Sequence, residues 1–237
     1  MKLKFLQWVS NGFSGNWTKE YNRHSYWDSI ITNVDLCHLS RIDDNGLSIV
    51  HDYFPHVFYT KQNKLQDDSY LVIAATKDIF KNIKIAQLPS FSKTKQSNPG
   101  NGSIAISYNV NDTQFIAAHP VFADNNITNN DNLNDITSIF KNVAIEKNCL
   151  IATDFHRPNP DPEIDALVTS NNFTSHLDNL GTFIQMFNNT YHCTNLDKCL
   201  IRGNVEISNI TSVHLPITES TASFHMAVSY DLNLKGE

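Results

Sequence analysis

The sequence has little charge of either sign and no long apolar run. Of its 237 residues only 18% are charged, and the formal net charge at pH 7 is −6. An acidic chain lacks the positive field that usually marks nucleic-acid-binding proteins, so nucleic acid would have to bind through a local groove. No apolar stretch approaches the roughly 20 residues of a membrane-spanning helix. These absences exclude a membrane span and make a protein a better candidate partner than nucleic acid.

The N-terminal residues MKLKFLQWVSNG lack the apolar segment and the small-residue cleavage site of a secretory signal peptide. The localisation of the protein is therefore unknown. The chain is either cytoplasmic, or it is exported without a visible signal peptide or after a leader has been removed.

Cysteine is scarce, and none of the four cysteines forms a C-x-x-C pair. This excludes a zinc ribbon and a thioredoxin-like redox site. Cys37 and Cys149 lie in apolar runs, which predicts buried thiols. Cys193 and Cys199 are near enough in sequence to bridge a short loop, and the sequence leaves open whether they do.

Short apolar or alternating runs, separated by Asn, Asp, Gly or Pro, make up most of the chain. They predict strands at 3–9, 34–42, 69–76, 82–88, 102–110, 113–122, 149–155, 181–187, 198–203, 205–216 and 223–232. Apolar residues at helical spacing predict helices at 24–33 and 131–147, the second capped by Asn130 or Asp131, and a weaker helix at 162–168. This order predicts one α/β domain over residues 1–237, with two mixed sheets packed face to face and helices outside.

Six stretches occur in an order that matches a known family: LQWVSNG, VDLCHLSRI, FIAAHPV, IATDFHRP, LDKCLI and ASFHMAV. The chain resembles the endonuclease/exonuclease/phosphatase superfamily, which has the DNase I-like four-layer sandwich. It is most similar to the B subunit of cytolethal distending toxins, which follows its Gly-Asp-Phe-Asn motif with Arg and a nearby Pro. The resemblance implies Mg²⁺-dependent cleavage of phosphate esters, in which one His activates water and another His stabilises the phosphate oxygens.

The resemblance implies a remnant catalytic site when the family's site residues are matched to positions in this sequence. It consists of His119, Asp154, Asp197 and His225. Three further residues would face the substrate in the same cleft, namely Arg41, His156 and Arg157.

The departures from the family pattern fall on the metal site. Val9 stands where the family has Asn, Arg41 where it has Glu, and His156 where it has the Asn of the Gly-Asp-Phe-Asn motif. Phe224 replaces an Asp expected to orient a general base. Because a guanidinium repels Mg²⁺ and has no acceptor atom, we expect the dication site to be lost. We further expect Arg41 to pair with Asp154 across the old site.

Two alternatives keep a metal at this place. A register shift would bring Asn11 or Asp43 toward the site, since alternate residues on a strand share a face. Alternatively, the histidines rebuild the centre around a softer metal that accepts imidazole, with Asp154 and His156 as ligands.

The leading hypothesis is therefore a DNase I-like pseudoenzyme that needs no cofactor and binds an unidentified protein partner. The toxin resemblance implies a role in a bacterial virulence or toxin system. The alternative is an active phosphodiesterase, nuclease or phosphatase with a remodelled His-rich site that uses Mg²⁺, Mn²⁺ or Zn²⁺.

Overall fold

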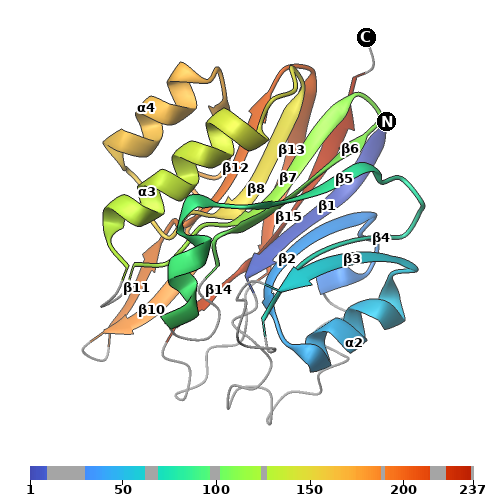
Figure 1. Cartoon of the computed structure of the whole chain (residues 1–237). Helices are drawn as coiled ribbons and strands as arrows, with labels where there is room; N and C mark the ends of the chain where they lie inside the picture. The colour runs from blue at the N-terminus through green and yellow to red at the C-terminus, as the bar shows by residue number, and fades with distance from the viewer. Residues whose placement is uncertain are drawn as a thin grey trace.

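The computed structural model describes residues 1–9, 30–61, 69–96, 102–123, 127–187, 190–213 and 223–235. Their strands form two six-stranded sheets and one three-stranded sheet (Figure 1). The first sheet has the order β13 (Val205–Val213), β15 (Ala227–Leu234), β1 (Lys2–Val9), β2 (Leu36–Ile42), β4 (Tyr70–Ala75), β3 (His56–Lys61). The second has the order β5 (Lys81–Gln87), β6 (Ile104–Val110), β7 (Thr113–His119), β8 (Cys149–Asp154), β12 (Asp197–Arg202), β9 (Thr174–Ser175). The third consists of β11 (Thr190–Thr194), β10 (Phe183–Phe187) and β14 (Ser223–His225).

Both large sheets are mixed, and their inner faces form the main core. In the first sheet β1 runs parallel to β2, and in the second β7 runs parallel to β8. The rings of Phe5 and Tyr230 stack within the first sheet, and those of Tyr108 and Phe115 stack within the second. Phe5 lies 6.2 Å from Phe115 between ring centroids, so the aromatic rings join the two sheets. Burial of such large side chains supplies most of the driving force for this packing.

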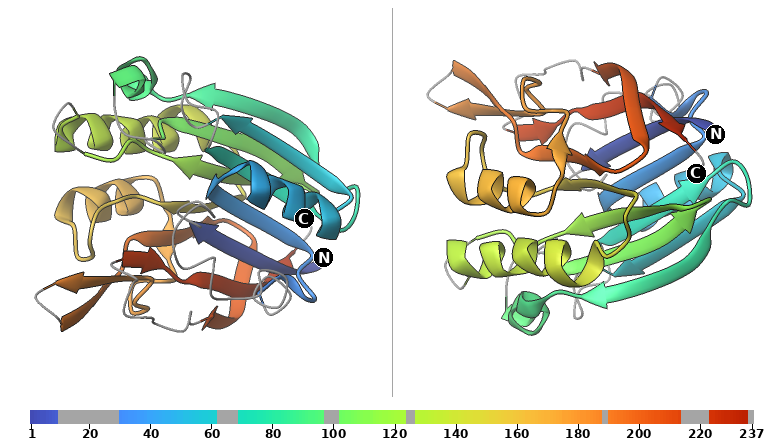
Figure 2. Two further views of the ribbon diagram at one scale, coloured as in Figure 1. Left: turned by 90° about the horizontal axis from the view of Figure 1, so that it is seen from below. Right: turned by 90° about the horizontal axis from the view of Figure 1, so that it is seen from above.

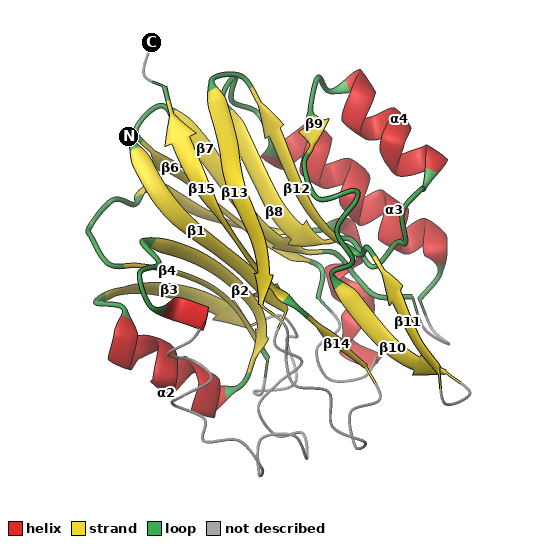
Figure 3. Ribbon diagram, turned by 180° about the vertical axis from the view of Figure 1, so that it is seen from behind, coloured by secondary structure: helices red, strands yellow, loops and turns green. Residues whose placement is uncertain are grey.

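Helices cover the outer faces. The helix α2 (Asp44–Tyr53) packs its apolar side on the first sheet. The second sheet is covered by α3 (Asn129–Ser138), its continuation into the π-helical turn η3 (Ile139–Val143), and α4 (Pro162–Ser170). Figures 2 and 3 show α3 and α4 together on one side of the molecule and α2 on the other. A short 3₁₀ helix, η2 (Pro89–Gln96), lies beside α3. The predicted α/β class with two facing mixed sheets and outer helices is confirmed.

Most predicted strands are present with ends shifted by a few residues, and the predicted helix at 162–168 is α4. The cap of α3 was predicted wrongly. Thr128 caps it, and Asp131 is the third residue of a capping box with Thr128. Of the predicted helix at 24–33 only residues 30–33 are described, and 30 and 31 are helical. Five elements were not predicted at all, namely α2, β3, η2, β9 and β11.

The open question about the cysteines has a clear answer. All four are free thiols, so Cys193 and Cys199 are not bridged. Cys37 and Cys149 are buried as predicted. Among the described residues, no helix is long and apolar enough to cross a membrane.

Candidate functional site

The candidate site lies where strand ends from both large sheets and the small sheet meet. The apolar strands β7 and β8 run parallel and end on His119 and Asp154. The antiparallel strand β12 begins on Asp197, which pairs in register with Asp154. His225 ends β14 of the small sheet. The topology therefore brings together four of the predicted site residues. The outermost two, His119 and His225, are more than 100 positions apart in the sequence.

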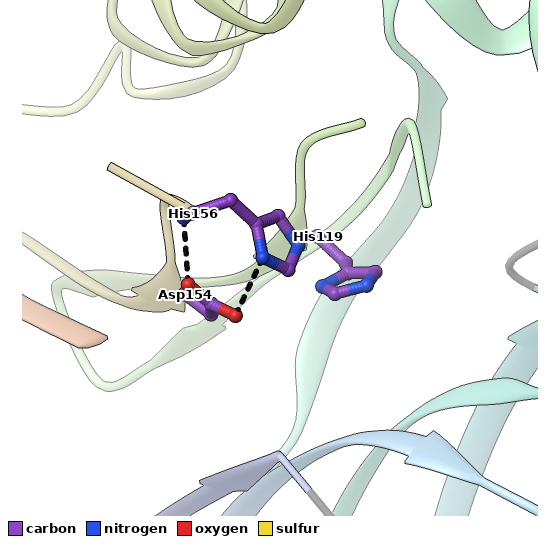
Figure 4. Close-up of side chains that lie close together, drawn as sticks. All are labelled: His119, Asp154 and His156. Atoms are coloured by element: carbon purple, nitrogen blue, oxygen red, sulfur yellow. Dashed lines mark hydrogen bonds and ion pairs between the residues drawn. The ribbon is translucent and has the colours of Figure 1, made fainter. Parts of the chain in front are cut away.

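Asp154 is held by the loop that follows β8 (Figure 4). Its Oδ1 accepts a hydrogen bond of 2.6 Å from the backbone N–H of His156. Its Oδ2 lies 2.9 Å from Nδ1 of His156 and 3.4 Å from Nε2 of His225. His156 has φ 56°, which lies in the left-handed region. The family's Asn at this position would accept the same backbone conformation easily.

His225 is fixed by a second carboxylate. Its Nδ1 lies 3.0 Å from Asp197 Oδ2, and its carbonyl oxygen accepts a 3.1 Å hydrogen bond from the indole N–H of Trp8. The backbone N–H of Asp197 donates to the hydroxyl of Thr182. The expectation that Phe224 deprives the histidine of its orienting carboxylate is therefore wrong, because Asp197 orients His225.

His119 completes the cluster from the side of β7. Its ring centroid lies 4.7 Å from that of His156, with the two rings at 71° to each other (Figure 4). Gly102 packs against it, and a Cβ atom on Gly102 would lie 2.2 Å from the carbonyl oxygen of His119. This close approach requires glycine at position 102.

Burial and charge pull the pKa values of these groups in opposite directions. Burial raises the pKa of Asp154, but the imidazoles of His156 and His225 lower it by more, so it lies below its usual range. Burial lowers the pKa of His225, but Asp197 and Asp154 raise it by more. Burial raises the pKa of Asp197. The surroundings therefore stabilise the ionised form of Asp154 and the protonated form of His225 relative to their other forms.

Arg41 lies on an irregular part of β2. The pairing of β2 with β4 shifts register between Leu39 and Ile42, and Arg41 has φ 57°. Burial lowers the pKa of its guanidinium, and the charge of Asp154 opposes that shift. The positive charge of Arg41 in turn lowers the pKa of His225. Arg41 thus acts electrostatically on the cluster, and a direct ion pair with Asp154 stays a prediction.

The register-shift alternative fails at Asp43. Its carboxylate caps α2 by accepting a 2.8 Å hydrogen bond from the backbone N–H of Gly46. The irregular register at Arg41 breaks the strand alternation on which that alternative depended. Asn11 lies outside the described residues.

Arg157 bonds to the start of α4. Its Nε lies 2.5 Å from Asp161 Oδ2, its Nη2 pairs with Glu163, and its Nη1 donates to the carbonyl of Asn129. Asp161 also caps α4 through the backbone N–H groups of residues 163 and 164. These contacts give Arg157 a structural role between the loop and the helix. Its predicted role in substrate binding stays a prediction.

A comparison with solved structures finds the same architecture in other proteins. A protein from Bacteroides vulgatus described as an endonuclease/exonuclease/phosphatase matches with TM-score 0.71 and 10% identity, over 99% of this chain and 100% of that one. The chain has the endonuclease/exonuclease/phosphatase fold, the DNase I-like fold. D. rerio TDP2, in complex with a single-stranded DNA product, matches with TM-score 0.69 and 10% identity, over 98% of this chain and 99% of that one. A mannosyl-6-phosphatase from Bacteroides thetaiotaomicron matches with TM-score 0.67 and 12% identity, also over 98% and 99%. No family model matches the sequence, and a comparison with curated proteins found no match.

The Mg²⁺ ion that the DNase I-like fold implies does not fit these residues. Val9, the last residue of β1, pairs in register with Ser40 of β2, and its side chain offers no donor atom to the cavity that both residues line. Mg²⁺ needs oxygen ligands and keeps several waters. The cavity beside Asp154 and Asp197, lined also by Val9, Trp8 and Ser40, has a volume of about 10 Å³, which holds about one water.

Two overlapping groups nevertheless have the composition of a transition-metal site. Ligand atoms of His119, Asp154 and His156 can be chosen within 4.8 Å of one another, and the same holds for Asp154, Asp197 and His225. Sequence reasoning missed three contacts that support these groups, made by Gly102, Thr182 and the indole of Trp8. His38 lines the small cavity, and burial lowers its pKa to about 3.

Proposed function

We propose that this DNase I-like chain has lost Mg²⁺-dependent phosphate-ester hydrolysis and acts by binding a protein partner. The observation that carries the proposal is the occupation of Asp154 Oδ2 by two imidazoles, with Nδ1 of His156 at 2.9 Å and Nε2 of His225 at 3.4 Å. A Mg²⁺ ion placed beside Asp154 would have to displace these imidazoles from the carboxylate. The resemblance assigns Arg41 to the position of the family's metal-binding Glu, so its guanidinium would add a positive charge near the ion.

The burial of the cluster supports the same conclusion. The side chains of Asp154 and Asp197 are 0% and 4% exposed, and that of His225 is 3% exposed. A phosphate group is several times larger than the single water that the adjoining cavity holds. A substrate phosphate would therefore have to displace protein atoms to reach these groups.

A protein partner is proposed because the chain has a net charge of −6. A nucleic-acid ligand, as seen in the TDP2 complex, would have to bind through a local groove against this overall charge. The role in a bacterial virulence or toxin system rests on the toxin resemblance alone.

The test is hydrolysis by the purified full-length chain. Nicking of supercoiled plasmid, cleavage of bis(p-nitrophenyl) phosphate and cleavage of p-nitrophenyl phosphate are measured with Mg²⁺. The proposal expects equal background rates for wild type and His225→Ala. Mg²⁺-dependent turnover that His225→Ala abolishes would overturn it.

The pairing of His225 with Asp197 favours one second candidate, an active phosphoesterase with a His-rich centre. A histidine whose Nδ1 is held by a carboxylate is the usual arrangement of a general base. This candidate expects hydrolysis with Mn²⁺ or Zn²⁺ but not with Mg²⁺, and its loss in both His225→Ala and Asp197→Ala. The same substrates, assayed with each metal in turn, separate the two candidates.

A further inference from the structure

Each of the two large sheets ends in an edge strand on the same side of the molecule (Figure 2). Among the described residues, β3 ends the first sheet, and β5 ends the second sheet and pairs only with β6. An edge strand presents a row of unpaired backbone N–H and C=O groups, which can pair with a strand of another chain. The outer edge of β5 is therefore a place where the second sheet can be extended.

Apolar side chains are exposed along this edge. Ile85 is 56% exposed, although it pairs in register with Ile106 of the core between the sheets. Ile83, two positions earlier, shares the same inner face of β5. In the facing sheet Phe58 is 42% exposed, and its ring centroid lies 5.4 Å from that of Phe80, which directly precedes β5. Ile83, Ile85, Phe58 and Phe80 thus form an apolar rim between the two edge strands.

Positive charge lies beside the apolar rim. Lys77, Lys81 and Lys84 are exposed, and no ion pair joins them to any residue that the structure describes. Asp78 is the one acidic residue between positions 76 and 87, whereas the whole chain has a net charge of −6. This edge is therefore basic on a chain that is acidic overall.

The lysines determine which occupant the edge favours. If β5 paired with the β5 strand of a second copy, the lysines of the two chains would lie near one another, and like charges on neighbouring strands are destabilising. Lysine on an edge strand is a common means of preventing such self-pairing. A segment with acidic residues would instead present the opposite charge, which favours that partner and speeds its association.

We propose that β5 binds an extended, acidic segment of another protein as an additional strand. Backbone hydrogen bonds to β5 hold the segment, its apolar side chains cover the apolar rim, and its alternate acidic side chains face Lys84. The proposal rests on the proposed function, since it names the surface and the kind of segment through which a protein partner binds. This surface includes none of the residues of the buried cluster.

Selection from a phage-displayed library of random linear peptides, longer than the 7 residues of β5, provides a defined probe. We expect the wild-type chain to enrich peptides in which apolar and acidic residues alternate. A selected peptide is then synthesised, and its binding is titrated by fluorescence anisotropy. Binding should slow amide hydrogen exchange in residues 81–87, because the outward N–H groups of β5 become hydrogen-bonded.

Two variants separate the charge from the apolar contact. Lys84→Glu reverses the charge, and Ile85→Thr removes the apolar contact while keeping a β-branched side chain. Each should weaken peptide binding by at least about fivefold. The matched controls are Lys2→Glu at an exposed position of β1 and Ile145→Thr at a position that is 63% exposed, and both should leave the affinity unchanged.

Failure to enrich acidic peptides, unchanged exchange in residues 81–87, or full affinity in Lys84→Glu would overturn the proposal. A wild-type dimer in sedimentation equilibrium that Ile85→Thr dissociates would also overturn it, since the occupant would then be a second copy. The hydrolysis assay reports on the buried cluster alone. Mg²⁺-dependent turnover by a chain that still binds the peptide at β5 would therefore contradict the loss of activity and leave the docking surface in place.

Discussion

The substitution Asp197→Asn removes one of the two carboxylates that hold the buried His225. It keeps the size of the side chain and an oxygen near Nδ1 of the imidazole. It therefore removes the negative charge with little change in packing. The histidine keeps Asp154, whose Oδ2 lies 3.4 Å from Nε2, as its remaining anionic neighbour.

The expected cost follows from this environment. Removing one partner of a buried ion pair typically costs about 3–5 kcal/mol, because the other charge stays buried. Since Asp154 still compensates part of the charge on His225, the lower end applies, and we expect a loss of about 3 kcal/mol. For a chain of this length each kcal/mol shifts the melting temperature by about 2–4 °C, which gives a decrease of about 6–12 °C.

The pH dependence of this loss is the sharper test. The pKa of His225 is raised in the folded state, so its stabilisation is complete below the unfolded value of about 6.5 and is lost as pH rises through the folded pKa. Asp197 is one cause of that raised pKa. The difference in stability between wild type and Asp197→Asn should therefore be largest at about pH 6 and shrink as the pH rises.

Urea unfolding followed by circular dichroism at a series of pH values measures this difference. Glu206→Gln is the control, because that carboxylate lies in an exposed pair with Lys235 and its loss should leave the midpoint unchanged. A loss of stability in Asp197→Asn that is absent at pH 6, or that grows toward alkaline pH, would refute the reasoning.

Three further predictions concern the surroundings of the cluster. Gly102→Ala should lower stability by about 1–3 kcal/mol in thermal unfolding, because its Cβ would lie 2.2 Å from the carbonyl oxygen of His119; an unchanged melting temperature would contradict the close approach. Arg41→Glu replaces the guanidinium by an oxygen ligand but leaves the imidazoles beside Asp154 in place, so equilibrium dialysis should still show no saturable Mg²⁺ binding; binding by this variant would mean that the guanidinium alone excludes the ion. Arg157→Ala should speed proteolysis near the start of α4, because it removes the contacts of Arg157 with Asp161 and Glu163; an unchanged cleavage rate would contradict this structural role.

Much of the fold was predictable because the core strands are continuous apolar runs. β4 and β8 are buried along their whole length. Short continuous apolar runs of this kind indicate buried strands from the sequence alone. The missed strand β3 is an edge strand with two exposed aromatic residues, so its pattern does not alternate clearly. The missed helix α2 contains Gly46 and β-branched residues, which lower its helix propensity.

The residues of the site were predictable from the sequence, but the contacts between them were not. The motif order identified His119, Asp154, Asp197 and His225, and the structure brings them together. The partnership of His225 with Asp197 depends on how the small sheet docks at the end of β12, which no local pattern encodes. The irregular register at Arg41 likewise arises from the pairing of β2 with β4, and it breaks the alternation used to place Asp43.

The central claim is that Arg41 and the imidazoles leave no place for Mg²⁺ beside Asp154. Equilibrium dialysis of the wild-type chain against Mg²⁺, with metal content measured by atomic emission, tests it most directly. The account predicts no saturable Mg²⁺ binding by the wild-type chain. One equivalent of Mg²⁺ that binds saturably and is lost in Asp154→Asn would contradict the account.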